Sequence, residues 1–488
     1  MTSLVGRQLQ VIGVLKAADN LRWLSRLAWI RGRGQQARQL ALEAVRVLEQ
    51  LPPGRELAMA YSTMSQLYML AEDGAAAVEW GQHALRIAEP LGLIETIVHA
   101  LNNIGTAELL MANPEGRAKL ERSLKLALSH DMHEHVARAY LNLAYHSLVV
   151  RDYARFEPLV TDGLTHAKEH ELDSYTLFAM AERSRASLEQ GLWREAEDEA
   201  SAVVRAAPGA NSWLVAAAVV GSVRVRQGGS EVGPLLDEAR ERAWATGEIK
   251  QIGPISAARA EAAWLKGDRE RVRDEVRGAY VLALRHPEPW RLGELGLWLW
   301  RAGALDQPLD GMALPYRLEI GGDWQGAAAA WRRIGCPYEE ALALAHGDRA
   351  AQLQALEILT GLGAAPAAAM IRRNLRTEGA RGIPRGPRAA TRHNPVGLTS
   401  RQVAILALLG EDLSNKEIAT QLRIAPKTVD HHVCAVLAKL EVSSRKQAAR
   451  HPVTRALLAE AASPVQPNAW MAAQALKLDL AHVGHRAC

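Results

Sequence analysis

The stretch from residue 57 to residue 91 reads LAMAYSTMSQLYMLAEDGAAAVEWGQHALRIAEPL and shows the pattern that decides the fold of most of the chain. It contains two helix-like apolar segments, residues 57–70 and 75–91, separated by the break Glu72-Asp73-Gly74. A glycine at such a break can adopt the positive φ that ends a helix and turns the chain. The stretch therefore predicts two helices joined by a short turn.

The same pair of segments recurs between residues 18 and 302, with starts spaced by roughly 40 residues. Further glycine-containing breaks are Gln190-Gly191, Gln227-Gly228-Gly229 and Lys266-Gly267-Asp268. One helix pair cannot bury its apolar face alone, so we expect neighbouring pairs to stack. The first segments are residues 19–30, 57–70, 96–110, 136–150, 175–190, 213–227, 255–266 and 291–301. The second segments are residues 36–50, 75–91, 116–130, 154–170, 194–207, 231–246 and 271–284.

This arrangement resembles the tetratricopeptide-repeat class, although its period exceeds the 34 residues usual there. Residues such as Ala76-Ala77-Val78-Glu79 and Ala84-Leu85 match the repeat pattern only loosely. The sequence predicts an all-α, tetratricopeptide-like superhelix of helical pairs over residues 1–303. Helical segments without this rhythm follow over residues 304–377, and we expect them to cap the superhelix.

The composition predicts a cytoplasmic protein. The chain is 48% hydrophobic and 23% charged, which excludes a disordered or fibrous chain. Three scattered cysteines, Cys336, Cys434 and Cys488, are too few for a disulfide framework or a zinc site and favour a reducing compartment. The longest apolar stretch, near residues 213–220, is too short to span a membrane, and the first 16 residues lack the features of a signal peptide.

Positive charge gathers toward the end of the chain. Residues 371–488 contain 18 Lys and Arg against 8 Asp and Glu, while the whole chain has 58 against 54. Glycine and proline punctuate residues 378–397, which predicts a linker. This linker carries the arginines Arg381, Arg385, Arg388 and Arg392. It is interpreted either as a solubilising linker or as an arm that follows a phosphate backbone.

Residues 398–450 are expected to form four short helices. Three of them begin with a predicted capping box, in which Thr399 pairs with Gln402, Ser414 with Glu417 and Ser444 with Gln447. The third helix is expected to begin at Pro426, where the missing N–H costs nothing, and to run to about Leu440.

The predicted third helix has two different faces. Its apolar stripe consists of Val429, Val433, Val436, Leu437 and Leu440. The opposite face carries Lys427, Asp430, His431 and Cys434. A recognition helix needs such an apolar side to hold its bundle and a polar N-terminal side to enter the major groove of DNA. On spacing alone, an ordinary solvated helix face remains the alternative.

The order and spacing of several runs in residues 398–445 resemble the LuxR-type helix-turn-helix. These runs are Leu398-Thr399-x-Arg401, Leu413-Ser414-Asn415-Lys416-Glu417-Ile418-Ala419, Pro426-Lys427-Thr428-Val429-Asp430-His431-His432-Val433 and Lys439-Leu440-x-Val442-Ser443-Ser444-Arg445. With the repeat body, the chain resembles the large LuxR-type regulators, which carry an ATP-binding domain, a helical-repeat sensor and this DNA-binding domain. No G-x-x-x-x-G-K-[ST] motif occurs, so we expect this chain to lack the ATPase domain.

The resemblance implies roles for individual residues. Asp430, His431 and Cys434 would face bases. Phosphate-contacting or helix-orienting positions would be those of Asn415, Lys416, Lys427, Thr428, Ser444 and Arg445. The fourth helix would mediate homodimerisation on double-stranded DNA. Three residues depart from the family pattern: Ala425 replaces the usual capping Ser, while Asp412 and Glu441 replace glycines at sites that favour positive φ.

Other residue clusters have two interpretations each. His130, His133 and His135 could hold a metal, but a solvated turn is favoured. Asn102, Asn103 and Asn142 could line a concave ligand surface, but structural hydrogen bonding is favoured. Trp290, Trp298 and Trp300 are interpreted as core. No catalytic constellation stands out, so we expect no enzyme, no cofactor and no metal site.

The sequence thus predicts a bacterial transcription regulator. Residues 398–450 would bind duplex DNA, and the superhelix would sense an effector or a protein partner, with RNA polymerase as a further partner. The alternative is a helical-repeat interaction protein whose helix-turn-helix no longer binds DNA specifically. Residues 451–488 receive no role, and neither the operator, the effector nor the direction of regulation follows from the sequence.

Overall fold

The computed structural model describes residues 4–206, 211–229, 232–285, 287–377, 398–440, 442–452 and 454. Within these ranges the chain is all-α, which confirms the predicted fold class. The chain divides into two compact units, Met1–Ile383 and Pro384–Cys488. Across the residues that are described, no helix is both long enough and apolar enough to span a bilayer.

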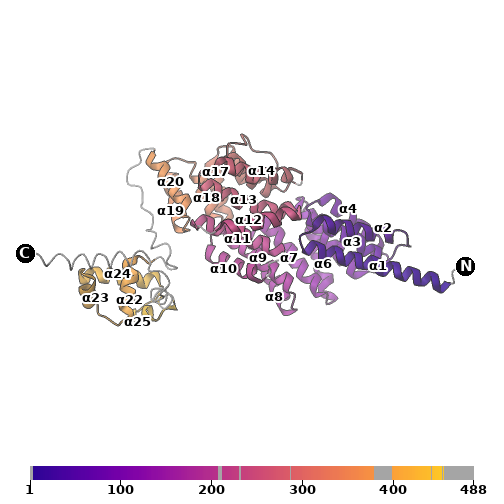
Figure 1. Ribbon diagram of the computed structural model, residues 1–488, viewed down its shortest axis with the longest axis horizontal. Helices are drawn as coiled ribbons and strands as arrows, with labels where there is room; N and C mark the ends of the chain where they lie inside the picture. The colour runs from indigo at the N-terminus through magenta and orange to yellow at the C-terminus, as the bar shows by residue number, and fades with distance from the viewer. Residues whose placement is uncertain are drawn as a thin grey trace, which may run out of the picture. The chain divides into compact units, whose positions relative to one another are not determined.

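The first unit is a stack of helical pairs that follow one another in chain order (Figure 1). The first helices of the pairs are α1 (Leu4–Ile30), α3 (Arg55–Leu70), α5 (Ile94–Leu110), α7 (His133–Val149), α9 (Asp173–Glu189), α11 (Asn211–Gln227) and α13 (Ile249–Leu265). The second helices are α2 (Gly34–Leu48), α4 (Gly74–Ala88), α6 (Glu115–Ser129), α8 (Tyr153–Glu169), α10 (Trp193–Ala206), α12 (Gly233–Thr246) and α14 (Arg269–Arg285). Each predicted first and second segment up to residue 284 overlaps one of these helices, although α1 begins well before the expected residue 19.

The turns between paired helices confirm most of the predicted breaks. Three predicted glycines have φ values of +81°, +87° and +82°, and these are Gly191, Gly228 and Gly267. In the turn after α3, however, the residue with positive φ is Glu72 (+61°), while Gly74 begins α4. A Cβ at Gly74 would lie 2.6 Å from the sulfur of Met111, a flexible and exposed side chain that can move aside. The carboxylate of Asp73 caps α4 by accepting a hydrogen bond from the amide of Ala76.

Small residues allow the two helices of a pair to approach closely. A Cβ added to Gly105 of α5 would lie 2.6 Å from the backbone oxygen of Gly116 in α6. A Cβ on Gly116 would meet the backbone oxygen of Gly105 at 2.3 Å. Any larger residue at either position would push the two backbones apart, so this pair depends on both glycines.

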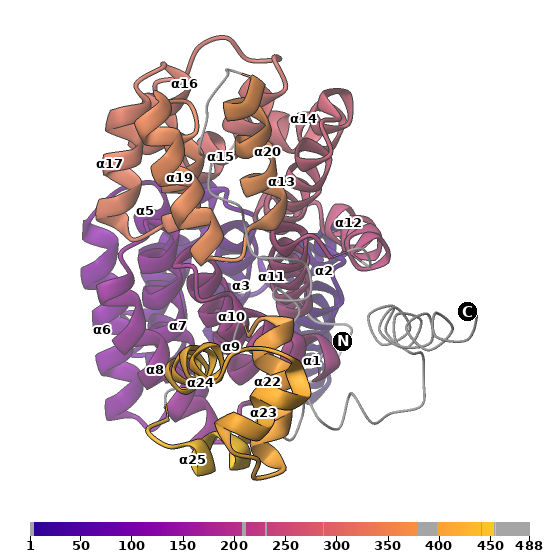
Figure 2. The ribbon, with the colours of Figure 1, turned by 90° about the vertical axis from the view of Figure 1, so that its left-hand side faces the viewer.

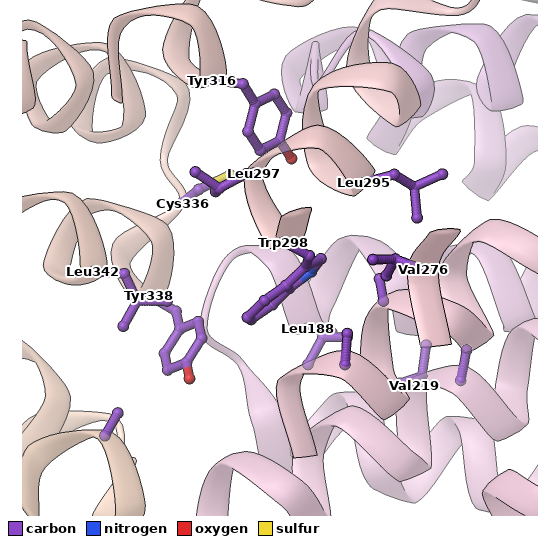
Figure 3. Packing of buried hydrophobic residues seen from close by; sticks show 14 of the residues in the cluster. Leu188, Val219, Val276, Leu295, Leu297, Trp298, Tyr316, Cys336, Tyr338 and Leu342 are labelled. Atoms are coloured by element: carbon purple, nitrogen blue, oxygen red, sulfur yellow. The ribbon is translucent and has the colours of Figure 1, made fainter. Parts of the chain in front are cut away.

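The helices after α14 continue the same hydrophobic core. They are α15 (Pro289–Arg301), α16 (Leu314–Ile320), α17 (Trp324–Ile334), α18 (Pro337–Leu344), α19 (Arg349–Gly361) and α20 (Ala365–Thr377). Trp331 and Tyr338 are almost fully buried, in the same cluster as residues of α9 to α15. Figure 3 shows Trp298 of α15 between Tyr338 and Val276 in this core. Residues 304–377 therefore pack onto the superhelix.

Over residues 398–452, apart from the undescribed residue 441, the second unit forms four short helices, as the sequence predicts (Figure 2). They are α22 (Ser400–Gly410), α23 (Asn415–Leu422), α24 (Pro426–Lys439) and α25 (Arg445–Arg450). The unit has its own core, in which Ile405, Ile418, Val429 and Val436 have no measurable exposure. This small core holds the exposed side of α24 on a fixed scaffold.

Candidate nucleic-acid interface and repeat cavity

Two predicted capping boxes fix the starts of α22 and α23. The Thr399 hydroxyl accepts from the amide of Gln402 (3.2 Å), and the Gln402 side chain accepts from the amide of Thr399 (2.9 Å). The same reciprocal bonds join Ser414 and Glu417, at 3.3 and 2.8 Å. The bond from the Ser414 side chain keeps the pKa of Glu417 below its usual range.

The predicted third capping box is only half correct. The Ser444 hydroxyl accepts from the amide of Gln447 at 3.3 Å and caps α25. The Gln447 side chain, however, accepts from the amide of Ser443 (3.1 Å) and not from that of Ser444. Ser444 has an extended backbone, and the return bond reaches the preceding residue instead.

A short turn from Arg423 to Ala425 joins α23 to α24, as in a helix-turn-helix. Arg423 adopts the left-handed conformation (φ +51°), a position where such turns favour glycine. Arg401 of α22 donates to the backbone oxygen of Leu422 at 2.7 Å, which holds the end of α23. From the sequence, Arg401 was recognisable only as part of the motif, and nothing marked Arg423 as a turn residue. The turn after α22 confirms the expectation for Asp412, which has φ +61°.

The two faces of α24 are as predicted. Val429, Val433, Val436 and Leu440 are buried, and Leu437 packs against the same core. The exposed side chains are those of Lys427, Thr428, Asp430, His431 and Cys434. The polar residues therefore lie together on the side of the helix that is free to meet another molecule.

Asn415 lies against the exposed polar face of α24. Its side-chain amide donates to the Asp430 carboxylate at 3.2 Å, and its own Oδ1 is buried without a partner among the described residues. This bond orients the Asp430 carboxylate from the first turn of α23. Neighbouring Lys416 is exposed at the same helix start. Asn415 is thus placed to position Asp430.

Arg445 contributes to the packing of the second unit. Its guanidinium donates to the backbone oxygen of Leu413, which precedes α23. Its side chain is half-buried, so this bond fixes α25 against the connection between α22 and α23. The linker arginines Arg381, Arg385, Arg388 and Arg392 lie outside the described residues, as do Glu441 and residues 455–488.

The N-terminus of α24 lacks a side-chain cap. Ala425 occupies the N-cap position with an extended backbone (φ −71°, ψ 143°) and makes no capping bond. A serine there could accept from a free amide, so Ala425→Ser is expected to stabilise the second unit by about 1 kcal/mol. Ser414→Ala, which removes an existing cap, should destabilise it by about the same amount. Thermal unfolding of the full chain measures both variants. If Ala425→Ser and Ser414→Ala shifted the melting temperature of the second unit in the same direction, side-chain capping would not explain the stability of these helix starts.

The first unit contains a partly open cavity of about 350 Å³. Its walls come from the odd-numbered helices α1 to α15, from α16 to α18, and from the turn residues Glu72 and Arg151. None of the even-numbered helices from α2 to α14 contributes a residue. The cavity is therefore lined by the inner layer of the superhelix.

Contacts between distant repeats close the inner layer around this cavity. The indole N–H of Trp29 in α1 donates to Glu248, beside α13, at 2.8 Å. Arg291 of α15 pairs with Glu72, and both side chains are nearly inaccessible. These contacts join the first two repeats to residues 248–291, so the cavity depends on the curvature of the whole superhelix.

The three asparagines are mainly structural, as the sequence analysis favoured. Asn103 donates to the backbone oxygen of Ser62 at 2.9 Å and accepts from Arg138. Asn142 donates to the Asn102 side chain at 2.6 Å. Of the three, Asn142 lines the cavity. These bonds link α3, α5 and α7 across successive repeats.

The structure does not bring His130, His133 and His135 together as one cluster. His130 is exposed and lies 3.0 Å from the Ser129 hydroxyl. His133 instead gathers with His166 and His170 of α8 and its C-cap, with ring nitrogens within 4.8 Å of one another. The His133 and His170 rings stack at 3.6 Å. Burial lowers the pKa of His166, which favours its neutral form. Spacing along one loop could not reveal residues from a neighbouring helix.

The tryptophans interpreted as core are largely so. Trp298 is buried, and Trp290 and Trp300 pack against the same cluster. Trp298 and Leu297 also line the cavity, a role that the sequence did not reveal.

The geometry of α22 to α25 defines a helix-turn-helix DNA-binding domain, and comparison with known proteins gives its family. Residues 396–451 match the model for "Bacterial regulatory proteins, luxR family". The chain is 50% identical over 52 residues to the transcriptional regulatory protein LiaR of Bacillus subtilis, covering 11% of this chain and 25% of LiaR. It is 45% identical over 62 residues to the DNA-binding transcriptional activator DevR/DosR of Mycobacterium tuberculosis, covering 12% and 29%.

The second unit therefore contains a LuxR-family helix-turn-helix domain. The chain spans only about a quarter of the length of these relatives. A solved structure of a Rap protein complexed with competence and sporulation factor is also similar. It aligns with a TM-score of 0.43 at 12% identity over 68% of this chain and 99% of that protein.

Proposed function

We propose that this protein is a cytoplasmic bacterial transcription regulator that binds duplex DNA through the exposed face of α24. The observation that carries the proposal is the family match over residues 396–451, together with a polar face held above a buried apolar stripe. The free amides at the start of α24 place a positive dipole end beside Lys427, and both favour phosphate.

Side chains on this face suit base contacts in the major groove. The Asp430 carboxylate, oriented by Asn415, can accept a hydrogen bond from cytosine N4. His431 can donate to a guanine acceptor. Asp430 would repel phosphate if it missed its base, so affinity must depend on Lys427, Lys416 and the linker arginines.

Two substitutions separate these roles. Lys427→Ala is expected to weaken binding to every duplex and to lower the slope of log affinity against log salt by about 1, because it removes one phosphate contact. His431→Ala should change the preferred bases while leaving that slope nearly unchanged. The matched control is Lys125→Ala, which removes an exposed lysine from α6 in the first unit. If neither Lys427→Ala nor His431→Ala altered binding, α24 would not be the recognition helix.

We also propose that the protein binds DNA as a homodimer through α25, with RNA polymerase as a further partner. A two-fold dimer would place its recognition helices on half-sites about one helical turn apart. The helix is short, from Arg445 to Arg450, so flanking residues would have to contribute to the contact.

The superhelix is proposed to bind a small effector in the cavity of its inner layer. A volume of about 350 Å³ lies within the range of small-molecule sites, and the walls combine aromatic and charged residues. The positive-φ Arg423 and the uncapped Ala425 favour a second candidate, a repeat-type interaction protein whose domain no longer selects a DNA sequence. Selection of duplexes by the full chain distinguishes the two.

A further inference from the structure

Three histidine side chains meet where α7 and α8 lie side by side. His133 is the first residue of α7, while His166 lies in the last turn of α8 and His170 is its C-cap. A short turn joins the two helices, so they run antiparallel and the start of α7 lies beside the end of α8. One ring nitrogen from each histidine lies within 4.8 Å of those from the other two. The fold therefore brings together three metal-ligating side chains that are far apart in the chain.

The backbone of the two packed helices holds these rings near one another. His166 and His170 are four residues apart on α8, a spacing that puts two side chains on one face of a helix. The amide of His170 donates to the backbone oxygen of His166 at 3.2 Å, which keeps that spacing helical. The ring centroids of His166 and His170 are 4.4 Å apart, and the His133 ring lies 3.6 Å from the His170 ring and 5.4 Å from the His166 ring. A pair of histidines at this helical spacing can bind one metal ion, and His133 is placed to supply a third ligand from the neighbouring helix.

The state of the His166 ring suits a metal ligand. Its Nε2 atom is buried and has no hydrogen-bond partner among the described residues. Burial, and then the neighbouring His170 and His133, lower the pKa of His166, while the backbone of His133 and the carboxylate of Glu169 oppose this shift. A neutral imidazole keeps the lone pair that a metal ion requires. No hydrogen bond within the described part of the protein would have to break for this nitrogen to bind an ion.

Nitrogen ligands alone select a transition-metal ion. All three residues offer an imidazole nitrogen, which suits Zn²⁺, Cu²⁺ or Ni²⁺ better than the oxygen-preferring Ca²⁺ and Mg²⁺. Zn–N bonds are about 2.0–2.1 Å long, so the nitrogens around a tetrahedral ion lie roughly 3.4 Å apart. From separations of up to 4.8 Å, the three nitrogens must therefore close by at most roughly 1.4 Å. The planes of the His133 and His170 rings differ by only 12°, so one ring has to turn for both lone pairs to meet at one ion, and the exposed His170 has room to do so.

We propose that His133, His166 and His170 bind one Zn²⁺ ion, with water or an external ligand at the fourth coordination position. The ion would join the first turn of α7 to the last turn of α8 and so fix one helical pair of the superhelix. This reverses the expectation from the sequence, which predicts no metal site and considers His133 together with His130 and His135. The inference goes beyond DNA binding by the second unit and does not depend on it.

Equilibrium dialysis of the full chain, without a histidine tag and after treatment with a chelator, tests the proposal with ZnCl₂ as the probe. His170→Ala removes a ligand from an exposed position, so the fold should persist. Loss of an outer-shell partner alone costs about 10–100-fold in metal affinity, so loss of a ligand should weaken the tightest site by about 100-fold or more. The matched control His130→Ala changes an exposed histidine outside the cluster and should keep the affinity of the unchanged chain. Equal affinity of the unchanged chain and His170→Ala for Zn²⁺ would overturn the proposal.

Co²⁺ in place of Zn²⁺ reports the geometry of the site. An ion held by three imidazole nitrogens and one water is tetrahedral and absorbs visible light far more strongly than the octahedral aqueous ion. We expect this absorption in the unchanged chain and in His130→Ala, and its loss in His170→Ala and His166→Ala. The circular dichroism of each variant is expected to match that of the unchanged chain, which separates loss of a ligand from loss of the fold. An octahedral spectrum of the unchanged chain would mean that these histidines form only a solvated cluster of stacked rings, and the proposal would be wrong.

Discussion

Replacing Arg301 with methionine is expected to destabilise the first unit by about 3–5 kcal/mol, because it leaves a buried carboxylate without its counter-charge. The Arg301 guanidinium pairs with Glu319 at 2.8 Å, and the two side chains are only 4% and 1% exposed. The guanidinium also lies 4.8 Å from the Trp298 ring and 5.1 Å from the Trp264 ring. The free energy of unfolding, measured in urea with the full chain, checks the prediction.

Two controls separate burial from simple loss of charge. The double variant Arg301→Met/Glu319→Leu removes both charges and should recover most of the lost stability, since apolar residues can replace a buried ion pair. Arg55→Met breaks an exposed pair with Glu95, whose side chains are 67% and 47% accessible, and should cost about 0–1 kcal/mol. If Arg301→Met lowered the free energy of unfolding no more than Arg55→Met does, the Arg301–Glu319 pair would not be buried as described.

Replacing Ile418 with alanine is expected to destabilise the second unit by about 2–5 kcal/mol and to abolish binding to duplex DNA. Ile418 has no measurable exposure and lies at the centre of the small core beneath α24. The helix-turn-helix domain spans residues 396–451, and a domain of this size has only about 3–8 kcal/mol of stability, so this loss would leave much of it unfolded. Thermal unfolding of the full chain checks the prediction. The transition of the second unit should move to a lower temperature, and the transition of the first unit should stay where it is.

The conservative control is Ile418→Val, which should cost about 0.5–1.5 kcal/mol and retain DNA binding. Comparison with Lys427→Ala is also informative, because that variant should weaken binding without any change in melting. A folded Ile418→Ala variant that bound DNA normally would show that the core does not support the interface as described.

The fold followed from the sequence to a large extent because its signals are local. Apolar periodicity and breaks such as Gly191 and Gly267 lie within single repeats, and each marks a turn in the structure. The turn at Glu72 differs because the chain there places a non-glycine residue at positive φ, while Gly74 begins α4. The break Glu72-Asp73-Gly74 marks a turn in the sequence, but it does not show which of its residues takes the positive φ.

The face of α24 was also predictable, since one helix carries both its buried stripe and its exposed polar residues. The bond from Asn415 to Asp430 was not, because it joins residues of two helices whose orientation depends on the turn at Arg423. Resemblance to a family could suggest that Asn415 matters, but only the structure identifies the carboxylate that it orients.

The cavity could not be predicted because its residues come from repeats far apart in the chain. Arg151 and Trp331 both line the cavity and are in contact, yet 180 positions separate their numbers in the sequence. Their meeting depends on the curvature of the superhelix, which sums small rotations over many helix pairs. His166 and His170 escaped notice beside His133 for a simpler reason, because they lie on the paired helix α8 and its C-cap and not in the same loop.

Selection of duplexes from a random pool by the full chain, followed by affinity measurements at several salt concentrations, distinguishes a sequence-specific regulator from a protein that binds only phosphates. The account predicts an enriched motif with two half-sites about one helical turn apart, bound far more tightly than bulk DNA. Salt-sensitive binding without an enriched motif would contradict it, because phosphate contacts alone would then explain the affinity.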